Sequence, residues 1–149
     1  MKLVQEGTLE GTLKGPVPVG AGPIGTRMVY EITGGEIHGE RLRGRVVGGG
    51  EWALIGPDGF LRADVRVQIE THDGAFIYAQ YTGLLELNET VQAALASGGG
   101  TEFSDQHFYT NPRMETGDER YAWVNTTFFI GEGRLTPGPG VAYRLWRPA

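Results

Sequence analysis

Apolar and polar residues alternate without a break from Leu61 to Glu70. The apolar positions are Leu61, Ala63, Val65, Val67 and Ile69. Because successive side chains of a β-strand point to opposite faces of a sheet, this pattern predicts a strand with one buried face. The pair Asp73-Gly74 and a β-rich run over 75–82 follow, and together they predict a hairpin closed by a tight turn.

Similar runs predict further strands at 27–33, 36–47, 107–110, 121–130 and 141–146. The opening stretch, 2–13, follows the pattern less regularly because Gly7 and Gly11 interrupt it. The segment 88–97 differs. It starts with a capping asparagine, carries an apolar stripe and stops at Gly98, so it predicts one short helix.

Glycine supplies 25 of the 149 residues, against a usual share of about 7%. The glycines gather in short clusters at 33–35, 48–50, 57–59, 73–74, 98–100, 131–133 and 137–140. Glycine tolerates positive φ, so these clusters predict turns between strands. None of them has the spacing of a phosphate-binding loop.

Many short strands at hairpin spacing, with a single helix, predict an all-β protein. We expect an antiparallel barrel of about eight strands, because closure removes the exposed edges of a flat sheet. The length fits one domain over residues 1–149. The interior of a small barrel either fills with side chains or holds one small ligand, so this fold leaves the function open.

Composition excludes several kinds of chemistry. The chain has no cysteine, which rules out thiolate metal sites and a cysteine nucleophile. The net charge of −5 argues against a nucleic-acid partner. No stretch near the N-terminus has the apolar character of a signal or membrane segment, so we expect a cytoplasmic protein with no membrane partner. Neither serine lies in a nucleophile elbow.

Several short motifs follow one another in a distinctive order between Gly22 and Arg147. They are Thr33-Gly34-Gly35, Gly39, Gly44, Gly49-Gly50-Glu51-Trp52, Asp58-Gly59, Asp64-Val65-Arg66, Thr71-His72-Asp73-Gly74, Phe108-Tyr109-Thr110-Asn111-Pro112, Glu115-Thr116-Gly117-Asp118 and Arg120-Tyr121-Ala122-Trp123-Val124-Asn125. In this order they resemble the bacterial and fungal family called domain of unknown function 3237. The resemblance implies a calycin-like antiparallel barrel with a central cavity for a small organic molecule, and it implies no particular activity. The family pattern has aspartate before the tryptophan, where this chain has Glu51.

Glu51 is the strongest candidate for acid–base chemistry. It follows three glycines that allow close approach of the backbone, and a carboxyl in an apolar pocket has its pKa raised by desolvation. The alternative is a solvated Glu51 beside a buried Trp52, because adjacent strand residues point to opposite faces.

Arg62, Asp64 and Arg66 form a polar stripe on the predicted strand. They either line the lumen, where an arginine can bind a ligand, or form the solvent-exposed outer face of the sheet. The resemblance favours the lumen for Asp64 and Arg66.

Aromatic and polar side chains from several predicted strands form a third group. A barrel would bring several of them toward one axis, and tyrosine suits a pocket because it combines an apolar body with a hydroxyl. The alternative for each is an ordinary place in the core or rim. The predicted ligand-binding residues are Arg27, Trp52, Asp64, Tyr78, His107, Tyr109, Tyr121, Trp123 and Asn125, with Tyr121, Trp123 and Asn125 on one strand face. The tyrosine set also includes Tyr30 and Tyr81.

Three functions are consistent with these features. The first is a cofactor-independent lyase, isomerase or cyclase with Glu51, Tyr30 and Arg66 as catalytic residues, acting on a small hydrophobic, aromatic or polyketide-like molecule. The second is a carrier barrel without chemistry. The third is a structural module with a filled barrel that forms a homo-oligomer through its surface. The three histidines have no metal-ligand spacing, so we expect no metal and no cofactor.

Overall fold

The computed structural model describes residues 1–149 and contains nine strands, one α-helix and two 3₁₀ helices. The strands are β1 (Leu3–Gly22), β2 (Gly25–Gly39), β3 (Arg43–Ile55), β4 (Phe60–Thr71), β5 (Phe76–Glu86), β6 (Phe108–Thr110), β7 (Arg113–Glu115), β8 (Ile130–Thr136) and β9 (Gly140–Pro148). The helices are α1 (Glu89–Ser97), η1 (Phe103–Asp105) and η2 (Glu119–Thr126).

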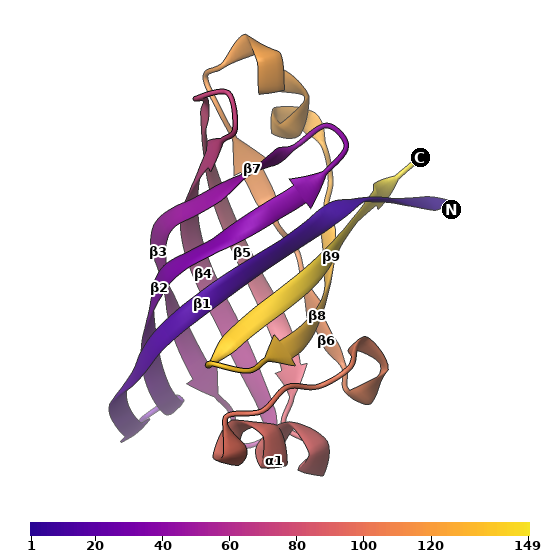
Figure 1. The fold of residues 1–149 in the computed structure, drawn as a ribbon. Helices are drawn as coiled ribbons and strands as arrows, with labels where there is room; N and C mark the ends of the chain where they lie inside the picture. Colours follow the sequence, from indigo (N-terminus) through magenta and orange to yellow (C-terminus); the bar gives the residue numbers. More distant parts are fainter.

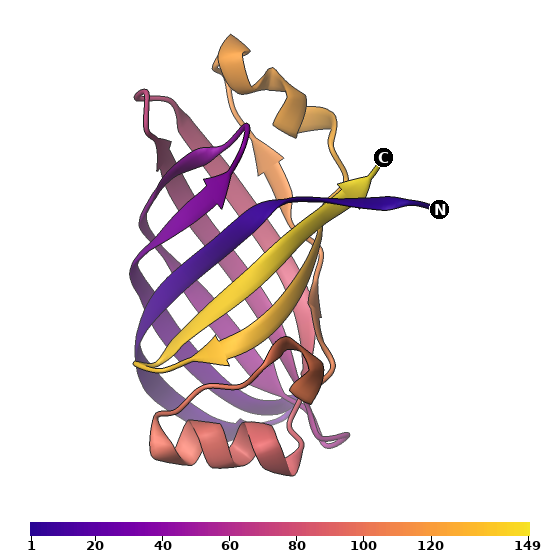
Figure 2. The same cartoon turned by 45° about the vertical axis from the view of Figure 1, so that its right-hand side comes forward.

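The strands close into an antiparallel barrel (Figure 1), which confirms the predicted fold class. Around the barrel the order is β1, β2, β3, β4, β5, β6, β8 and β9, and β9 pairs with β1 to complete the ring. β7 pairs with a different part of β5 from the part that β6 pairs with. The turned view in Figure 2 shows α1 lying across one end of the barrel, with η2 at the opposite end.

The clearest sequence patterns are confirmed. β4 buries Leu61, Ala63, Val65, Val67 and Ile69, and it pairs with β5 through the turn at Asp73-Gly74. α1 has the predicted ends. The side chain of Asn88 accepts a hydrogen bond from the Val91 N–H, and Gly98 adopts the left-handed conformation at φ 70°.

The prediction that every glycine cluster is a turn is wrong for three of them. Residues 33–35, 48–50 and 131–133 lie inside β2, β3 and β8. The pairing of β3 with β4 shifts register between Val46 and Gly48, which marks a β-bulge. A Cβ atom at Gly49 would collide with the Arg66 carbonyl of the neighbouring strand. These glycines therefore allow strands to bend and approach closely within the barrel.

The predicted strand over 121–130 is also wrong for most of its length. Residues 119–126 form η2, and β8 begins only at Ile130. Asp118 caps η2 by accepting a hydrogen bond from the Arg120 N–H, and the Tyr121 hydroxyl donates to Asp73 at 2.7 Å. These side-chain hydrogen bonds outweigh the β-propensity of the aromatic residues.

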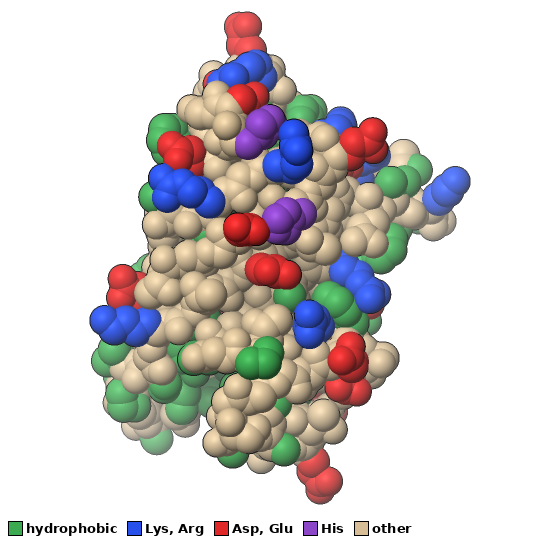
Figure 3. All heavy atoms as spheres, in the orientation of Figure 1, with side chains coloured by type: hydrophobic (Ala, Val, Ile, Leu, Met, Phe, Trp, Pro, Cys, Tyr) green, Lys and Arg blue, Asp and Glu red, His purple; other side chains and the backbone are tan.

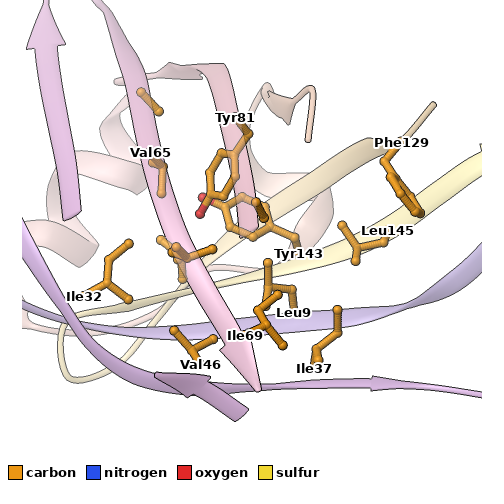
Figure 4. Packing of buried hydrophobic residues seen from close by; sticks show 14 of the residues in the cluster. Leu9, Ile32, Ile37, Val46, Val65, Ile69, Tyr81, Phe129, Tyr143 and Leu145 are labelled. Carbon is orange, nitrogen blue, oxygen red and sulfur yellow. The ribbon is translucent and has the colours of Figure 1, made fainter. Parts of the chain in front are cut away.

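The interior of the barrel differs between its two ends. Toward η2 it is filled by apolar side chains from many strands, including Ile37, Ile69, Phe129 and Leu145 (Figure 4). Toward α1 the side chains leave a cavity.

Candidate functional site

A cavity of about 670 Å³ lies in the barrel at the end near α1. Most of its lining is apolar or glycine. The larger apolar side chains are Leu13, Met28, Ile55, Leu61, Leu85, Leu87, Leu95, Phe108, Leu135 and Val141. A volume of this size accommodates a small organic molecule.

The rim of this cavity is apolar as well. Gly15 and Pro16 line it, and they begin the tip of the β1–β2 hairpin. Residues 15–25 carry no polar side chain, and Val17, Val19 and Ile24 are each more than 60% exposed. Figure 3 shows hydrophobic side chains gathered at this end of the molecule, below a face that carries charges of both signs.

Glu51 is the only charged residue among those that line the cavity. It lies on β3 with its side chain directed into the barrel, and it is only 8% exposed. Burial raises the pKa of the Glu51 carboxyl from its ordinary value of 4.5 to about 7. A carboxyl with that pKa exists in both protonation states near neutral pH, so it can donate or accept a proton.

The inward direction of Glu51 follows from its neighbours on β3. Trp52 points outward and is 42% exposed, so the strand alternation turns Glu51 into the barrel. The six-membered ring of Trp52 lies against Gly50 on the outer face, where a Cβ atom would approach the ring to 2.9 Å. The sequence left open whether Glu51 or Trp52 faces the interior, and in the structure Glu51 does.

Tyr30 is the direct partner of Glu51 on the neighbouring strand. The two residues are paired in the β2–β3 register, and both line the cavity. Burial and the nearby Glu51 charge raise the pKa of the Tyr30 hydroxyl above its ordinary value of 10. Tyr30 therefore keeps its proton at neutral pH and can donate a hydrogen bond to a bound molecule.

Two further tyrosines lie behind Glu51, away from the cavity. Tyr81 on β5 and Tyr143 on β9 are almost completely buried, with their rings edge to face at 5.4 Å between centroids. Figure 4 shows their hydroxyl groups directed to the same point. Tyr143 was not among the sequence candidates, although its position between Val141 and Leu145 on one strand face pointed inward.

The arginines predicted to act in the lumen lie outside it. Arg62 and Arg66 are exposed and Asp64 is half-buried, because β4 turns its apolar residues inward. Arg62 pairs with Asp58 in the preceding turn at 2.6 Å. The hypothesis that this stripe lines the lumen is therefore wrong, and Arg66 cannot contact a molecule in the cavity.

Four predicted ligand-binding residues border a groove on the outer surface. Arg27, Trp52, Asp64 and Tyr109 line this groove of about 570 Å³. The Arg27 guanidinium donates to the Trp52 carbonyl at 3.1 Å. The structure brings these residues together, but on the opposite side of the barrel wall from Glu51.

Tyr78 and His107 also lie outside the cavity. Tyr78 is half-buried on the outer face of β5 and donates a hydrogen bond to Gln80 at 3.2 Å. His107 is exposed and packs edge to face against Phe60 and Tyr109. His107 faces outward because Phe108, which lies between His107 and Tyr109, points into the barrel.

Tyr121, Trp123 and Asn125 lie on η2, at the opposite end of the barrel, and do not share a strand face. The Arg41 guanidinium stacks on the Trp123 ring at 3.8 Å from its centroid. The Asn125 amide bonds both backbone groups of Thr116. These contacts hold the η2 end of the barrel together, so the prediction that all three residues face the ligand pocket is wrong.

No group of three or more histidine, aspartate or glutamate side chains is arranged to hold a metal ion. No helix is both long enough and apolar enough to cross a bilayer.

Sequence comparison matches residues 1–148 to the family described as "Protein of unknown function (DUF3237)". A UPF0311 protein of Rhodopseudomonas palustris strain TIE-1 is 33% identical over 114 residues, covering 74% of each chain. The hydroalkoxylation enzyme phnH of Penicillium herquei is 32% identical over 99 residues, covering 66% of this chain and 52% of that enzyme.

Solved structures show the same fold. A conserved protein of unknown function from R. palustris superposes with a TM-score of 0.87 at 25% identity, covering 98% of this chain and 96% of that one. A β-barrel-like protein from Acinetobacter baumannii gives a TM-score of 0.79 at 27% identity, covering 99% and 96%. An enzyme from P. herquei gives 0.68 at 23% identity, covering 97% and 93%.

Proposed function

The chain belongs to the DUF3237 family, and within that family we propose that it is an enzyme that moves a proton on a small, largely apolar molecule. Glu51 is the acid–base group of this enzyme, and Tyr30 donates a hydrogen bond to an oxygen of the substrate. The observation that carries the proposal is the isolation of Glu51, the one charged residue in an apolar cavity of about 670 Å³.

The arrangement supports acid–base chemistry in three ways. The cavity is apolar, so it binds an uncharged molecule by removing its surface from water. The pKa of Glu51 of about 7 lets the group both accept and donate a proton within one turnover at neutral pH. Tyr30, paired with Glu51 across β2 and β3, can stabilise charge that develops on a substrate oxygen.

The relative from P. herquei supports a particular reaction class. That protein is named for hydroalkoxylation, the addition of an O–H group across a carbon–carbon double bond. In that addition the oxygen bonds to one carbon, the proton goes to the other, and neither oxidant nor reductant is consumed. Glu51 can take the proton from the hydroxyl and return it to carbon, so addition, elimination and isomerisation all fit this site.

The proposal is tested by incubating the protein with extract of its source cells in D₂O. We expect a small apolar metabolite to gain deuterium at a carbon atom, detected by mass spectrometry. Glu51→Gln, which keeps the side-chain shape and removes the titrating group, should abolish that incorporation. Arg66→Gln, an exposed change on the outer face of β4, is the control and should behave as the wild-type protein.

A carrier without chemistry is the second candidate, because the same apolar cavity would bind a ligand. It predicts capture of a metabolite from the extract with no deuterium gain, and binding by Glu51→Gln as good as by the wild-type protein. The structural module with a filled barrel is disfavoured by the cavity itself.

A further inference from the structure

A second, small space lies behind Glu51, on the side away from the main cavity. Its volume is about 10 Å³, and its lining includes Glu51, Tyr81 and Tyr143. Glu51, Leu13 and Val141 border both this void and the main cavity, so the Glu51 side chain stands between the two spaces.

The Tyr143 hydroxyl is an unusual group in this part of the barrel. Tyr143 is 2% exposed, and its hydroxyl has no well-aligned hydrogen-bond partner in the protein, where the one polar side chain beside it is the Tyr81 hydroxyl. A buried hydroxyl without a partner costs about 1 to 3 kcal/mol, so a fold that keeps one at this position calls for an explanation. Phenylalanine would pack equally well there, since the ring itself contacts Tyr81 and Phe108.

The void has the properties of a site for one water molecule. A water needs a space of about 10 to 15 Å³ and two to four polar partners. The carboxyl of Glu51 and the hydroxyls of Tyr81 and Tyr143 supply three partners around this space. The rest of the lining is apolar or has its polar side chain in solvent, as Glu10 does.

We propose that Tyr143 is a positioning residue for Glu51, and that it acts together with Tyr81 through one water molecule held in this void. The water donates a hydrogen bond to the Glu51 carboxylate and accepts one from the Tyr143 hydroxyl. These two hydrogen bonds keep the Glu51 carboxyl directed toward the main cavity and stabilise its ionised form. The inference rests on the proposed role of Glu51 in catalysis, and it assigns a role to residues that do not touch the substrate.

The surroundings of Glu51 limit what else could control its ionisation. The titratable groups that face it are Tyr30 on β2, Tyr81 on β5 and Tyr143 on β9. β4 contributes only Val65 and Val67, and β1 contributes Leu9 and Leu13 besides the backbone around Glu10. Tyr30 lies on the cavity side of Glu51, so Tyr81 and Tyr143 are the groups available behind it.

The test measures Glu51 directly, without any substrate. Protein labelled with ¹³C in the glutamate carboxyl is titrated by NMR, and the Glu51 signal is assigned by its loss in Glu51→Gln. Tyr143→Phe keeps the ring packing and removes only the hydroxyl. We expect it to raise the Glu51 pKa by about one unit, because a hydrogen bond to a charged group is worth about 1.5 kcal/mol or more.

Tyr81→Phe should shift the same titration in the same direction, and it serves as the second variant if Tyr143→Phe does not fold. Tyr78→Phe is the control. It removes a hydroxyl from the outer face of β5, the strand that carries Tyr81, and should leave the Glu51 titration unchanged. An unchanged titration in Tyr143→Phe, with equal or greater stability, would show that the hydroxyl is merely unpaired and would overturn the proposal.

The two proposals fail separately. If Glu51→Gln keeps its turnover, the proposed function is wrong, whatever the titration shows. If Glu51→Gln loses turnover but Tyr143→Phe titrates as the wild-type protein does, the catalytic role of Glu51 stands and the positioning role of Tyr143 does not.

Discussion

At the scale of single residues, Glu51 makes the stability of the protein depend on pH. The folded protein holds the Glu51 proton up to about pH 7, whereas an ordinary carboxyl releases it near 4.5. Below pH 4.5 both folded and unfolded states are protonated. As the pH rises from 4.5 to 7, the unfolded state loses its proton first, so the free energy of unfolding falls.

We therefore expect Glu51→Gln to become the more stable protein as the pH rises. A pKa of about 7 in place of 4.5 corresponds to about 3 kcal/mol. Urea unfolding of both proteins between pH 4 and pH 8 measures the difference, which should grow through this interval and level off above it. A difference that stays constant with pH would mean that Glu51 is not desolvated in the folded barrel.

Arg66, on the outer face of β4, should contribute little to either stability or ligand binding. Arg66 is exposed on β4 and forms no ion pair. Arg66→Ala should change the free energy of unfolding by no more than about 0.5 kcal/mol. Ligand capture from extract should also be unchanged, since the barrel wall separates Arg66 from the cavity. Loss of capture in this variant would place the binding site on the outer face of β4 instead of in the cavity.

The residue scale also shows where sequence reasoning reached its limit. The sequence predicts Glu51 and Tyr30 as catalytic residues because a carboxyl and a phenol suit acid–base chemistry, and the barrel places both at one cavity. The direction of Glu51 stayed open, because a large aromatic such as Trp52 usually takes the buried position. Here Gly50, with no side chain, leaves room on the outer face for the Trp52 ring, so Trp52 lies outside and Glu51 inside.

At the scale of elements, α1 covers the cavity end of the barrel and depends on its cap. Asn88 accepts from the Val91 N–H at 2.9 Å and donates to the Asp105 carbonyl at 2.8 Å. Asn88→Ala should lower the free energy of unfolding by about 1 kcal/mol. Hydrogen exchange of the amides in 89–97 should also become faster, while Asn88→Ser keeps an acceptor and should retain most of the protection.

A second element-scale prediction concerns β8, where Gly133 lies against Phe108. A Cβ atom at Gly133 would stand 2.7 Å from the Phe108 ring. Gly133→Ala must therefore displace a buried ring that lines the cavity. We expect a loss of about 1 to 3 kcal/mol in urea unfolding. Gly117→Ala, where a Cβ atom would meet nothing within 4 Å, is the matched control and should cost far less.

Local patterns predicted the elements well where one interaction dominated. Strict alternation gave β4, and a capping residue with a terminal glycine gave α1. Local patterns gave wrong predictions where contacts between distant segments determine the secondary structure. Gly35 and Gly49 have the sequence signature of turn residues, but a Cβ atom at either would collide with a carbonyl of the neighbouring strand, so glycine is needed within the strand itself. Tyr121 read as a strand residue, but its hydroxyl bond to Asp73 holds it in η2.

At the scale of the whole molecule, the closed barrel could be predicted, but its division into a filled and a hollow half could not. That division depends on the summed volumes of side chains from all eight strands around the ring, which no single segment reveals. Toward η2, Phe129 and the isoleucines fill the lumen. Toward α1, the apolar side chains and six glycines that line the lumen leave the space that Glu51 enters.

The hollow half makes a prediction for the protein as a whole. Met28 lines the cavity two residues before Tyr30 on the same face of β2, so Met28→Trp should fill part of the space without disturbing the strand pairing. The probe is N-phenyl-1-naphthylamine, an uncharged apolar fluorophore. We expect its affinity to fall about tenfold in Met28→Trp, a loss of about 1.4 kcal/mol.

Glu31→Trp adds the same ring to an exposed position on the same strand and should leave the affinity unchanged. In the wild-type protein the affinity should also weaken as the pH rises through about 7, because an ionised Glu51 disfavours an apolar neighbour. That pH dependence should vanish in Glu51→Gln. Equal affinity in Met28→Trp, together with pH-independent binding, would place the probe outside the barrel and remove the physical basis for a buried acid–base site.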